Sequence, residues 1–218
     1  MIEKNQIWIT KKINDTQRKF VEDLNLSIIE EPLIEIKYLD FPNDILQFDG
    51  WIFTSQNALK NLKNLDFKGK IYVFGQKSEN ILKKKGYKNY TLSKKNILDL
   101  GNKILNDKCK NLLYLCGNLR LDILSNILKK HNINLTESVV YETHLVPKKL
   151  NIKKHDSIFF FSPSAVKSFS LKNNFSNDYK YYCIGETTAE VLKKFGQSSI
   201  IPKNLSFESM ITTHINKN

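Results

Sequence analysis

Five short segments contain hydroxyl, amide or glycine residues. Each segment follows an apolar stretch and precedes a stretch in which apolar residues recur at helical spacing. These segments are Thr54–Asn57, Gly75–Ser78, Gly117–Asn118, Ser162–Ser164 and Gly185–Thr188. The first N–H groups of a helix have no partner within it, and together with the helix dipole they favour anionic oxygen atoms. The candidate contact residues for an anionic ligand are therefore Thr54, Ser55, Asn57, Gly75, Ser78, Gly117, Ser162, Ser164, Gly185, Thr187 and Thr188. For any single turn the alternative is simpler, because the same residue types cap helices and allow tight turns.

Two further groups carry charge or a transferable proton. Lys11 and Lys12 follow the first predicted strand directly, so we expect them at its carboxyl edge as anion contacts. Tyr141 and His144, in the segment YETH, are the candidates for proton transfer because this segment is expected where two domains join. Residue composition alone favours a half-buried strand aromatic at Tyr141. No Ser/His/Asp order, Cys/His pair or carboxylate pair indicates a different catalytic arrangement.

Metal and nucleotide motifs are missing from the sequence. Its three cysteines form no CxxC pair, and its four histidines form no HxxxH pair. Neither GxGxxG nor GxxxxGK[ST] occurs. We therefore expect no metal site, no disulfide framework and no nucleotide binding through those motifs.

The elements that carry these turns repeat within the chain. Residues 52–60 (IFTSQNALK) align without a gap with residues 159–167 (FFFSPSAVK). Residues 72–86 (YVFGQKSENILKKKG) align in the same way with residues 182–196 (YCIGETTAEVLKKFG). Each aligned segment predicts a strand, a turn and a helix, and the second pair ends in a glycine at the helix C′ position. Strands that alternate with helices predict parallel sheets with helices on both faces.

The repeat also predicts how the chain is divided. Residues 1–34 supply a strand and a helix, whereas the second half lacks one such unit. Joining them gives a discontinuous α/β domain of residues 1–34 plus 147–218 and an inserted α/β domain of residues 40–139. Residues 35–39 and 140–146 have strand composition and are expected to pair as a connector. If the two domains face each other, the turns line one cleft between them.

Composition limits the classes of protein that fit. The 218 residues are 41% hydrophobic, which is enough for a core, and the formal charge is +12. All but two of the 34 basic residues are Lys, which reads bases less well than Arg, so we expect no nucleic-acid partner. The apolar stretches are far shorter than the roughly 20 residues of a membrane span. The opening MIEKNQIWITKK lacks the apolar core of a signal peptide, so a cytoplasmic location is expected.

Taken in order, these segments resemble the uroporphyrinogen-III synthase family. The resemblance rests on WIFTSQNAL (51–59), YVFGQKSENILKKKGY (72–87), LLYLCGNLR (112–120), VVYET (139–143), IFFFSPSAVKSF (158–169) and YCIGETTAEVLKKFG (182–196). It covers nearly the whole chain, and the ordered set is more specific than any one motif. Lys77-Ser78-Glu79 stands where the family usually has Thr-Ala, and Lys11-Lys12 replaces its common Thr-Arg, and both departures keep polar or basic character.

The resemblance implies a fold and a reaction. The fold is α/β, with two similar domains whose parallel sheets are flanked by helices and joined by a two-stranded β connector. The enzyme is a cytoplasmic, monomeric lyase of heme and tetrapyrrole biosynthesis that works without a cofactor. It cyclises hydroxymethylbilane to uroporphyrinogen III with inversion of ring D through a spiro intermediate and loss of water. A transient hand-over of substrate from hydroxymethylbilane synthase is part of the same expectation.

Site roles follow from the resemblance as well. The tyrosine of the family's Y-x-T segment, here Tyr141, becomes the candidate acid for the departing hydroxyl, and the turn hydroxyls become contacts for the carboxylates of the substrate. Two alternatives stay open from the residues alone. One is a two-domain binding protein or regulator that closes on an anionic small molecule without chemistry, and the weaker one is nucleic-acid binding through the basic surface.

Overall fold

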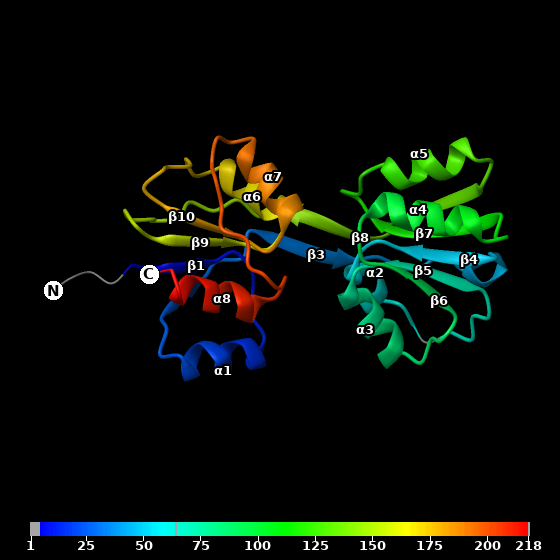
Figure 1. The fold of residues 1–218 in the computed structure, drawn as a ribbon, viewed down its shortest axis with the longest axis horizontal. Coiled ribbons are helices and arrows are strands. Elements are labelled where there is room, and N and C mark those ends of the chain that lie inside the picture. Colours follow the sequence, from blue (N-terminus) through cyan, green and yellow to red (C-terminus); the bar gives the residue numbers. More distant parts are fainter. Residues whose placement is uncertain (1–4, 64, 218) are drawn as a thin grey trace. The chain divides into compact units, whose positions relative to one another are not determined.

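The computed structural model describes residues 5–63 and 65–217, so the first four residues of the opening segment lie outside the described part. The chain divides into two compact units, one of residues 1–35 with 144–218 and one of residues 36–143 (Figure 1). We call them the discontinuous unit and the inserted unit and describe each by itself.

The discontinuous unit is a three-layer α/β structure. Its strands are β1 (Ile7–Ile9), β2 (Ile28–Glu30), β9 (Ser157–Phe160) and β10 (Lys180–Cys183), and its helices are α1 (Asp15–Asp23), α6 (Pro163–Ser170), α7 (Glu186–Lys193) and α8 (Phe207–Ile215). The sheet has the order β10-β9-β1-β2, and all three strand pairs are parallel. Helices α6 and α7 cover one face of the sheet, and α1 and α8 cover the other (Figure 1).

The inserted unit repeats this architecture around a larger sheet. Its strands are β4 (Gly50–Phe53), β5 (Lys70–Phe74), β6 (Tyr90–Ser93), β7 (Asn111–Gly117) and most of β8 (Asn134–Leu145), and its helices are α2 (Gln56–Lys60), α3 (Gln76–Lys84), α4 (Ile97–Asn106), α5 (Ile123–Lys130) and the short 3₁₀ turn η1 (Ile45–Gln47). The six-stranded sheet has the order β3-β8-β7-β4-β5-β6, where β3 is Ile34–Tyr38. From β8 to β6 every pairing is parallel.

Strands β3 and β8 carry the chain from one unit to the other. The Leu39 N–H donates to the Val140 carbonyl at 3.0 Å, and the Val146 N–H donates to the Leu33 carbonyl at 2.9 Å. Residue numbers increase along one strand while those of the bonded partners decrease along the other, so this pair is antiparallel. The two-stranded β connector and the α/β class with helix-flanked parallel sheets are therefore present as expected.

Strict alternation along the strands explains why each sheet carries helices on both faces. In β4, Trp51 and Phe53 pack in one buried cluster with α2 and α3, whereas Ile52 between them packs in the opposite cluster with α4 and α5. In the discontinuous unit, Trp8 and Phe160 pack with α6 and α7. A strand that is apolar on both faces must be covered on both, which is why these strands appear as continuous apolar stretches in the sequence.

The internal repeat extends to the burial of individual residues. Residues 51–60 and 158–167 share one sequence of buried, half-buried and exposed positions, and so do residues 71–80 and 181–190. The glycines that end the second pair of helices differ by one place. Gly86 directly follows the C-cap of α3, whereas Gly196 lies one residue further from the C-cap of α7, so the predicted C′ position is wrong for Gly196. Both glycines have positive φ, at 81° and 76°.

One pair of equivalent glycines differs in backbone conformation, and this yields a stability prediction. Gly75 has φ 84° and ψ 147°, a region open essentially to glycine, whereas Gly185 is extended with φ −178°. A Cβ at Gly75 meets nothing within 4 Å, so Gly75→Ala is expected to cost about 1–3 kcal/mol through backbone strain alone. Gly185→Ala is the matched control and should change stability by less than about 0.5 kcal/mol. Urea unfolding followed by circular dichroism measures both, and equal losses would contradict the assignment.

Candidate functional site

The predicted residues of the inserted unit meet at one edge of its sheet. Strands β8, β7, β4 and β5 are consecutive neighbours. Tyr141 lies in β8 opposite Gly117 at the end of β7, Thr54 follows β4, and Gly75 follows β5. Because these strands are parallel, their carboxyl ends lie at the same edge, where open α/β sheets bind ligands. We call this edge the Tyr141 edge.

The discontinuous unit has an equivalent edge. Lys11 and Lys12 follow β1, Ser162 and Ser164 follow β9, and Gly185 follows β10, and these three strands are also consecutive and parallel. The sequence-predicted residues of this unit therefore gather at the carboxyl ends of its strands as well. We call this edge the Lys11 edge.

Tyr141 is half-buried, as its composition predicted, and packs against the Trp51 cluster. Burial raises the pKa of its hydroxyl, and a hydrogen bond with the Ser55 side chain opposes the rise. The phenol is therefore protonated at neutral pH and can donate a proton to a departing oxygen. The role of Tyr141 as a general acid stays a prediction.

Thr54 and Ser55 hold other polar groups of the Tyr141 edge in place. The Thr54 Oγ1 and the Tyr114 hydroxyl lie 2.7 Å apart, and burial raises the pKa of Tyr114 to about 12. The Ser55 Oγ accepts from the Asn57 N–H at 3.2 Å and caps α2, which has five residues. Helix capping, the simpler alternative for this turn, is thus real at Ser55. The cap uses the Ser55 oxygen as an acceptor, so the hydroxyl proton of Ser55 stays available to Tyr141.

Capping also accounts for Ser162, while two other hydroxyls are enclosed. The Ser162 Oγ accepts from the Ala165 N–H at 3.1 Å. Ser78 and Thr188, which are equivalent in the repeat, are only 2% and 3% exposed. Their N–H groups donate to the carbonyls of Gly75 and Gly185, both at 3.1 Å. Ligand contact through Ser78 or Thr188 therefore requires these residues to move and stays a prediction.

Lys11 is held in a defined place at the Lys11 edge. Its ammonium donates to the Gln17 Oε1 at 2.7 Å and lies 4.9 Å from the ring centre of Phe161 and 5.1 Å from that of Phe207. Contact with aromatic faces fixes a cation without neutralising it. Lys12 is exposed, so Lys11 is the better ordered of the two predicted anion contacts.

The remaining predicted residues lie in more open surroundings. Asn57 and Ser164 are half-buried, whereas Thr187 and His144 are exposed. The division of the chain assigns His144 to the discontinuous unit and Tyr141 to the inserted unit. The two candidates for proton transfer therefore belong to different units.

Comparison with known proteins identifies the family. A profile of the family described as "Uroporphyrinogen-III synthase HemD" matches residues 15–212, which is most of the chain. The chain belongs to this family. A curated relative, the "Uncharacterized protein RP474" of Rickettsia prowazekii (strain Madrid E), is 30% identical over 188 residues, and the match covers 84% of this chain. The chain spans 63% of the length of that relative.

Solved structures share the fold. The uroporphyrinogen-III synthetase of Helicobacter pylori 26695 aligns over 99% of this chain and 100% of its own, with a TM-score of 0.72 and 24% identity. A mutant uroporphyrinogen III synthase of the extremely thermophilic bacterium Thermus thermophilus aligns over the same shares with a TM-score of 0.71 and 14% identity. Both likenesses support the α/β architecture with two units.

A charged group beside the Tyr141 edge was missed as a site feature, although its arginine stands in the family's G-x-x-R segment. Arg120 donates through Nε to Glu137 Oε2 at 2.8 Å, and the Lys129 ammonium donates to Glu137 Oε1 at 2.8 Å. Burial alone would raise the pKa of Glu137, but the hydrogen bonds from Lys129 and Arg120 outweigh it and hold this pKa below its ordinary value. The group anchors the loop after β7 to β8, the strand that carries Tyr141.

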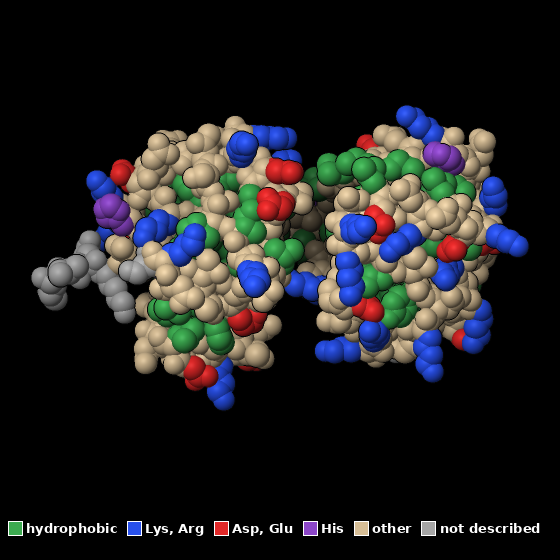
Figure 2. Space-filling view, viewed as in Figure 1, with side chains coloured by type: hydrophobic (Ala, Val, Ile, Leu, Met, Phe, Trp, Pro, Cys, Tyr) green, Lys and Arg blue, Asp and Glu red, His purple; other side chains and the backbone are tan. Residues whose placement is uncertain are grey.

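Charge and metal-binding groups elsewhere add no second site. Figure 2 shows Lys and Arg side chains distributed over the visible face of each unit, with Asp and Glu among them. Within residues 5–63 and 65–217, no three His, Cys, Asp or Glu side chains come together as a metal site. Over the same described part, no helix combines the length and the apolar character needed to cross a bilayer.

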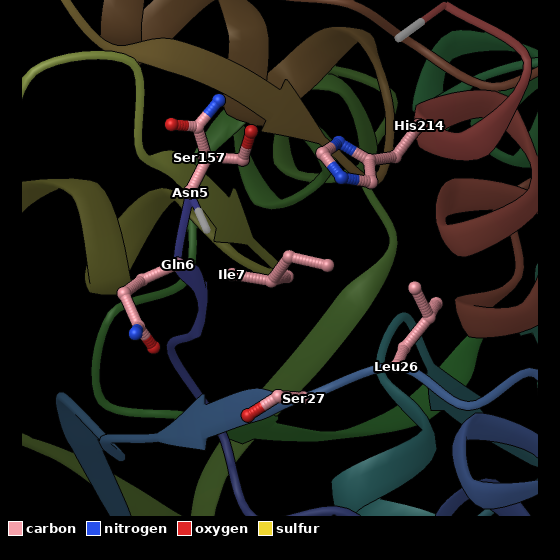
Figure 3. A pocket seen from close by; sticks show the side chains of 7 residues that line it. All are labelled: Asn5, Gln6, Ile7, Leu26, Ser27, Ser157 and His214. Carbon is pink, nitrogen blue, oxygen red and sulfur yellow. The ribbon is translucent and has the colours of Figure 1, made fainter. Parts of the chain in front are cut away.

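A pocket lies at the opposite end of the discontinuous unit's sheet, away from the Lys11 edge. Its lining residues are Asn5, Gln6, Ile7, Leu26, Ser27, Ser157 and His214 (Figure 3). Ile7 and Ser157 begin β1 and β9, so the pocket is at the amino ends of the strands. Its volume of about 200 Å³ is below the roughly 300–1,000 Å³ of typical ligand pockets. It contains none of the residues predicted for the site.

The charged group yields a prediction with a defined pH dependence. Glu137→Gln should lower the free energy of unfolding by about 1–2 kcal/mol near pH 7, because it removes the carboxylate that two cations share. The folded pKa of Glu137 lies below the ordinary 4.5, so its stabilisation is present above that value and is lost as the pH falls through the folded pKa. The free energies of unfolding of wild type and Glu137→Gln should therefore become similar in acid.

Urea titrations near pH 7 and at a series of lower pH values, down to where the carboxylate is protonated, measure this difference. Asp44→Asn is the matched control, since Asp44 is an exposed carboxylate of the same unit whose side chain makes no capping bond. A difference between Glu137→Gln and wild type that persists unchanged in acid would exclude the ionic interaction as its cause.

Proposed function

We propose that this chain is a uroporphyrinogen-III synthase, a cyclising lyase that converts hydroxymethylbilane to uroporphyrinogen III and water. The observation that carries the proposal is the family match over residues 15–212. The family name describes an enzyme, and the carboxyl edges of both sheets present hydroxyl, lysine and N–H groups suited to a polycarboxylate substrate.

Tyr141 is the group we assign to the leaving hydroxyl. Its phenol donates a proton to the hydroxymethyl oxygen, the C–O bond breaks, and the oxygen leaves as water. The substituted α-carbon of ring D then bonds to the resulting methylene carbon and gives the spiro intermediate. The old bond from this α-carbon to its bridge carbon breaks, the free α-carbon of ring D bonds to that bridge carbon, and the proton it loses returns to the Tyr141 phenolate. Burial holds the pKa of Tyr141 above its ordinary value, so the proton is in place when the substrate binds, and the hydrogen bond from Ser55 stabilises the phenolate that forms.

Binding and orientation are the larger part of the proposed mechanism. Closure at a substituted pyrrole carbon requires a folded substrate, so holding its carboxylates fixes the geometry of the reacting ends. We assign Lys11 and the first turns of α3, α6 and α7 to these carboxylates. The proposal includes a cytoplasmic monomer that works without a cofactor and receives its substrate from hydroxymethylbilane synthase.

The direct test is product analysis. Purified protein is mixed with freshly generated hydroxymethylbilane, and the uroporphyrin isomers are separated after oxidation. The proposal predicts an excess of isomer III over the isomer I that forms spontaneously. Isomer I alone, with the protein folded and the substrate consumed, would contradict it and would favour the two-domain binding protein instead.

Tyr141→Phe tests the assigned acid separately. Turnover should fall by about ten- to a hundredfold, while KM changes little, because the ring that packs on the protein is kept and only the proton donor is lost. Initial rates at several substrate concentrations provide the measurement. Tyr179→Phe is a suitable control, since Tyr179 lies in the discontinuous unit, just before the amino end of β10. Wild-type turnover in folded Tyr141→Phe would remove Tyr141 from the chemistry and leave positioning alone.

A further inference from the structure

The strand that carries Tyr141 is irregular at one place. Strands β7 and β8 pair in parallel register, with Cys116 opposite Val139 and then Gly117 opposite Tyr141. Val140 is thus an extra residue in β8, which is the definition of a β-bulge. Bulges between parallel strands are rare, and they re-aim the side chains that follow them.

The bulge changes the face on which Tyr141 lies. Val139 packs in the cluster of α4 and α5, whereas Val140 packs in the cluster of α2 and α3. In a regular strand Tyr141 would return to the side of Val139, because side chains alternate. Instead Tyr141 packs with Val140 in the cluster of α2 and α3. The extra residue therefore turns the phenol toward Ser55, the residue that caps α2.

Gly117 provides the surface on which the phenol rests. A Cβ at this position would lie 2.4 Å from Cζ and 2.6 Å from the hydroxyl oxygen of Tyr141, both far inside van der Waals contact. The backbone of Gly117 is that of a strand, so its conformation is open to other residues. The ring of Tyr141 alone explains the glycine.

Asn118 fixes the backbone on either side of Tyr141. Its N–H donates to the Tyr141 carbonyl at 3.3 Å, and its Oδ1 accepts from the Thr143 N–H at 2.9 Å. Its Nδ2 donates to the Thr143 carbonyl at 3.5 Å. The side chain therefore offers Thr143 the donor and acceptor of a neighbouring strand residue, just beyond the end of β7.

We propose that Gly117 and Asn118 are positioning residues for the general acid, and that together with the Val140 bulge they fix where the Tyr141 hydroxyl meets the substrate. The proposal rests on the proposed function, because it needs Tyr141 to act on a substrate. Gly117 appears above as a candidate ligand contact, and the structure gives it this more specific role instead.

Steady-state kinetics with hydroxymethylbilane test the proposal. Gly117→Ala should lower kcat about tenfold or more and leave KM within about twofold, because the added methyl group displaces the acid while the carboxylate contacts stay. Gly101→Ala is the matched control in the same unit. A Cβ at Gly101 would meet Ile127 at an ordinary 3.4 Å, so its kinetics should match wild type. A raised KM with an unchanged kcat would show that Gly117 contacts the substrate and would overturn the positioning role.

A double variant separates positioning from a general effect on structure. If Gly117 acts only through Tyr141, adding Gly117→Ala to Tyr141→Phe should lower kcat no further than Tyr141→Phe does. An equal fractional loss in both backgrounds would overturn the proposal. A phenolate titration gives a readout without substrate. Burial raises the pKa of Tyr141 in wild type, and we expect Gly117→Ala to move that pKa back toward its ordinary value.

Asn118 keeps the proposal testable if Gly117→Ala does not fold. Asn118 is exposed, so Asn118→Ala should fold and lose kcat, while Asn118→Asp keeps the acceptor for the Thr143 N–H and should recover part of the loss. Wild-type kcat in both Asn118 variants would overturn the role of Asn118. If wild type makes no excess of isomer III, the proposed function fails. If it does and Gly117→Ala matches wild type, only the positioning fails.

Discussion

Parallel strand pairing is the constraint on which the site depends. Parallel strands leave the sheet at the same edge, so residues as distant in sequence as Thr54 and Tyr141 become neighbours once β4, β7 and β8 pair. The apolar faces of those strands supply the driving force, since each strand is buried on both sides by helices. The residues to which we assign chemistry lie at the carboxyl edge of the sheet, where the core dictates residue type less strictly.

Duplication explains why two such edges exist, and divergence explains why they differ. The repeated segments of the two units share one burial pattern, although many of their residue types differ. Gly75 adopts a positive φ that its equivalent Gly185 does not. The inserted unit has the bulge and the half-buried phenol, whereas the discontinuous unit has an ammonium that lies against the rings of Phe161 and Phe207. One architecture thus presents a half-buried phenol on one unit and an ammonium in contact with aromatic rings on the other.

The helix and sheet layers, the connector and the turns could be predicted from the sequence, because they depend on local residue patterns. The strands at Trp51, Ile71, Leu112 and Ile158 were predicted from apolar stretches. The edge strands β2 and β6 were not, since their residues are only half-buried for the most part and lack a long apolar pattern. The pairing of Arg120 with Glu137 and the register shift at Val140 were also missed. Both depend on which strands become neighbours, and that information is tertiary.

The proposed function places a polyanionic ligand at the carboxyl edges of the sheets, and such a ligand would give part of the +12 charge a specific partner. Amide chemical-shift mapping of the isotopically labelled protein, titrated with uroporphyrinogen III kept in its reduced form, tests this placement most directly. We expect the amide chemical shifts to change in the turns after β4, β5, β7, β9 and β10, including residues 54–57 and 185–188. Perturbations confined to the amino-end pocket around Asn5 and Ser27, or none at all, would contradict it.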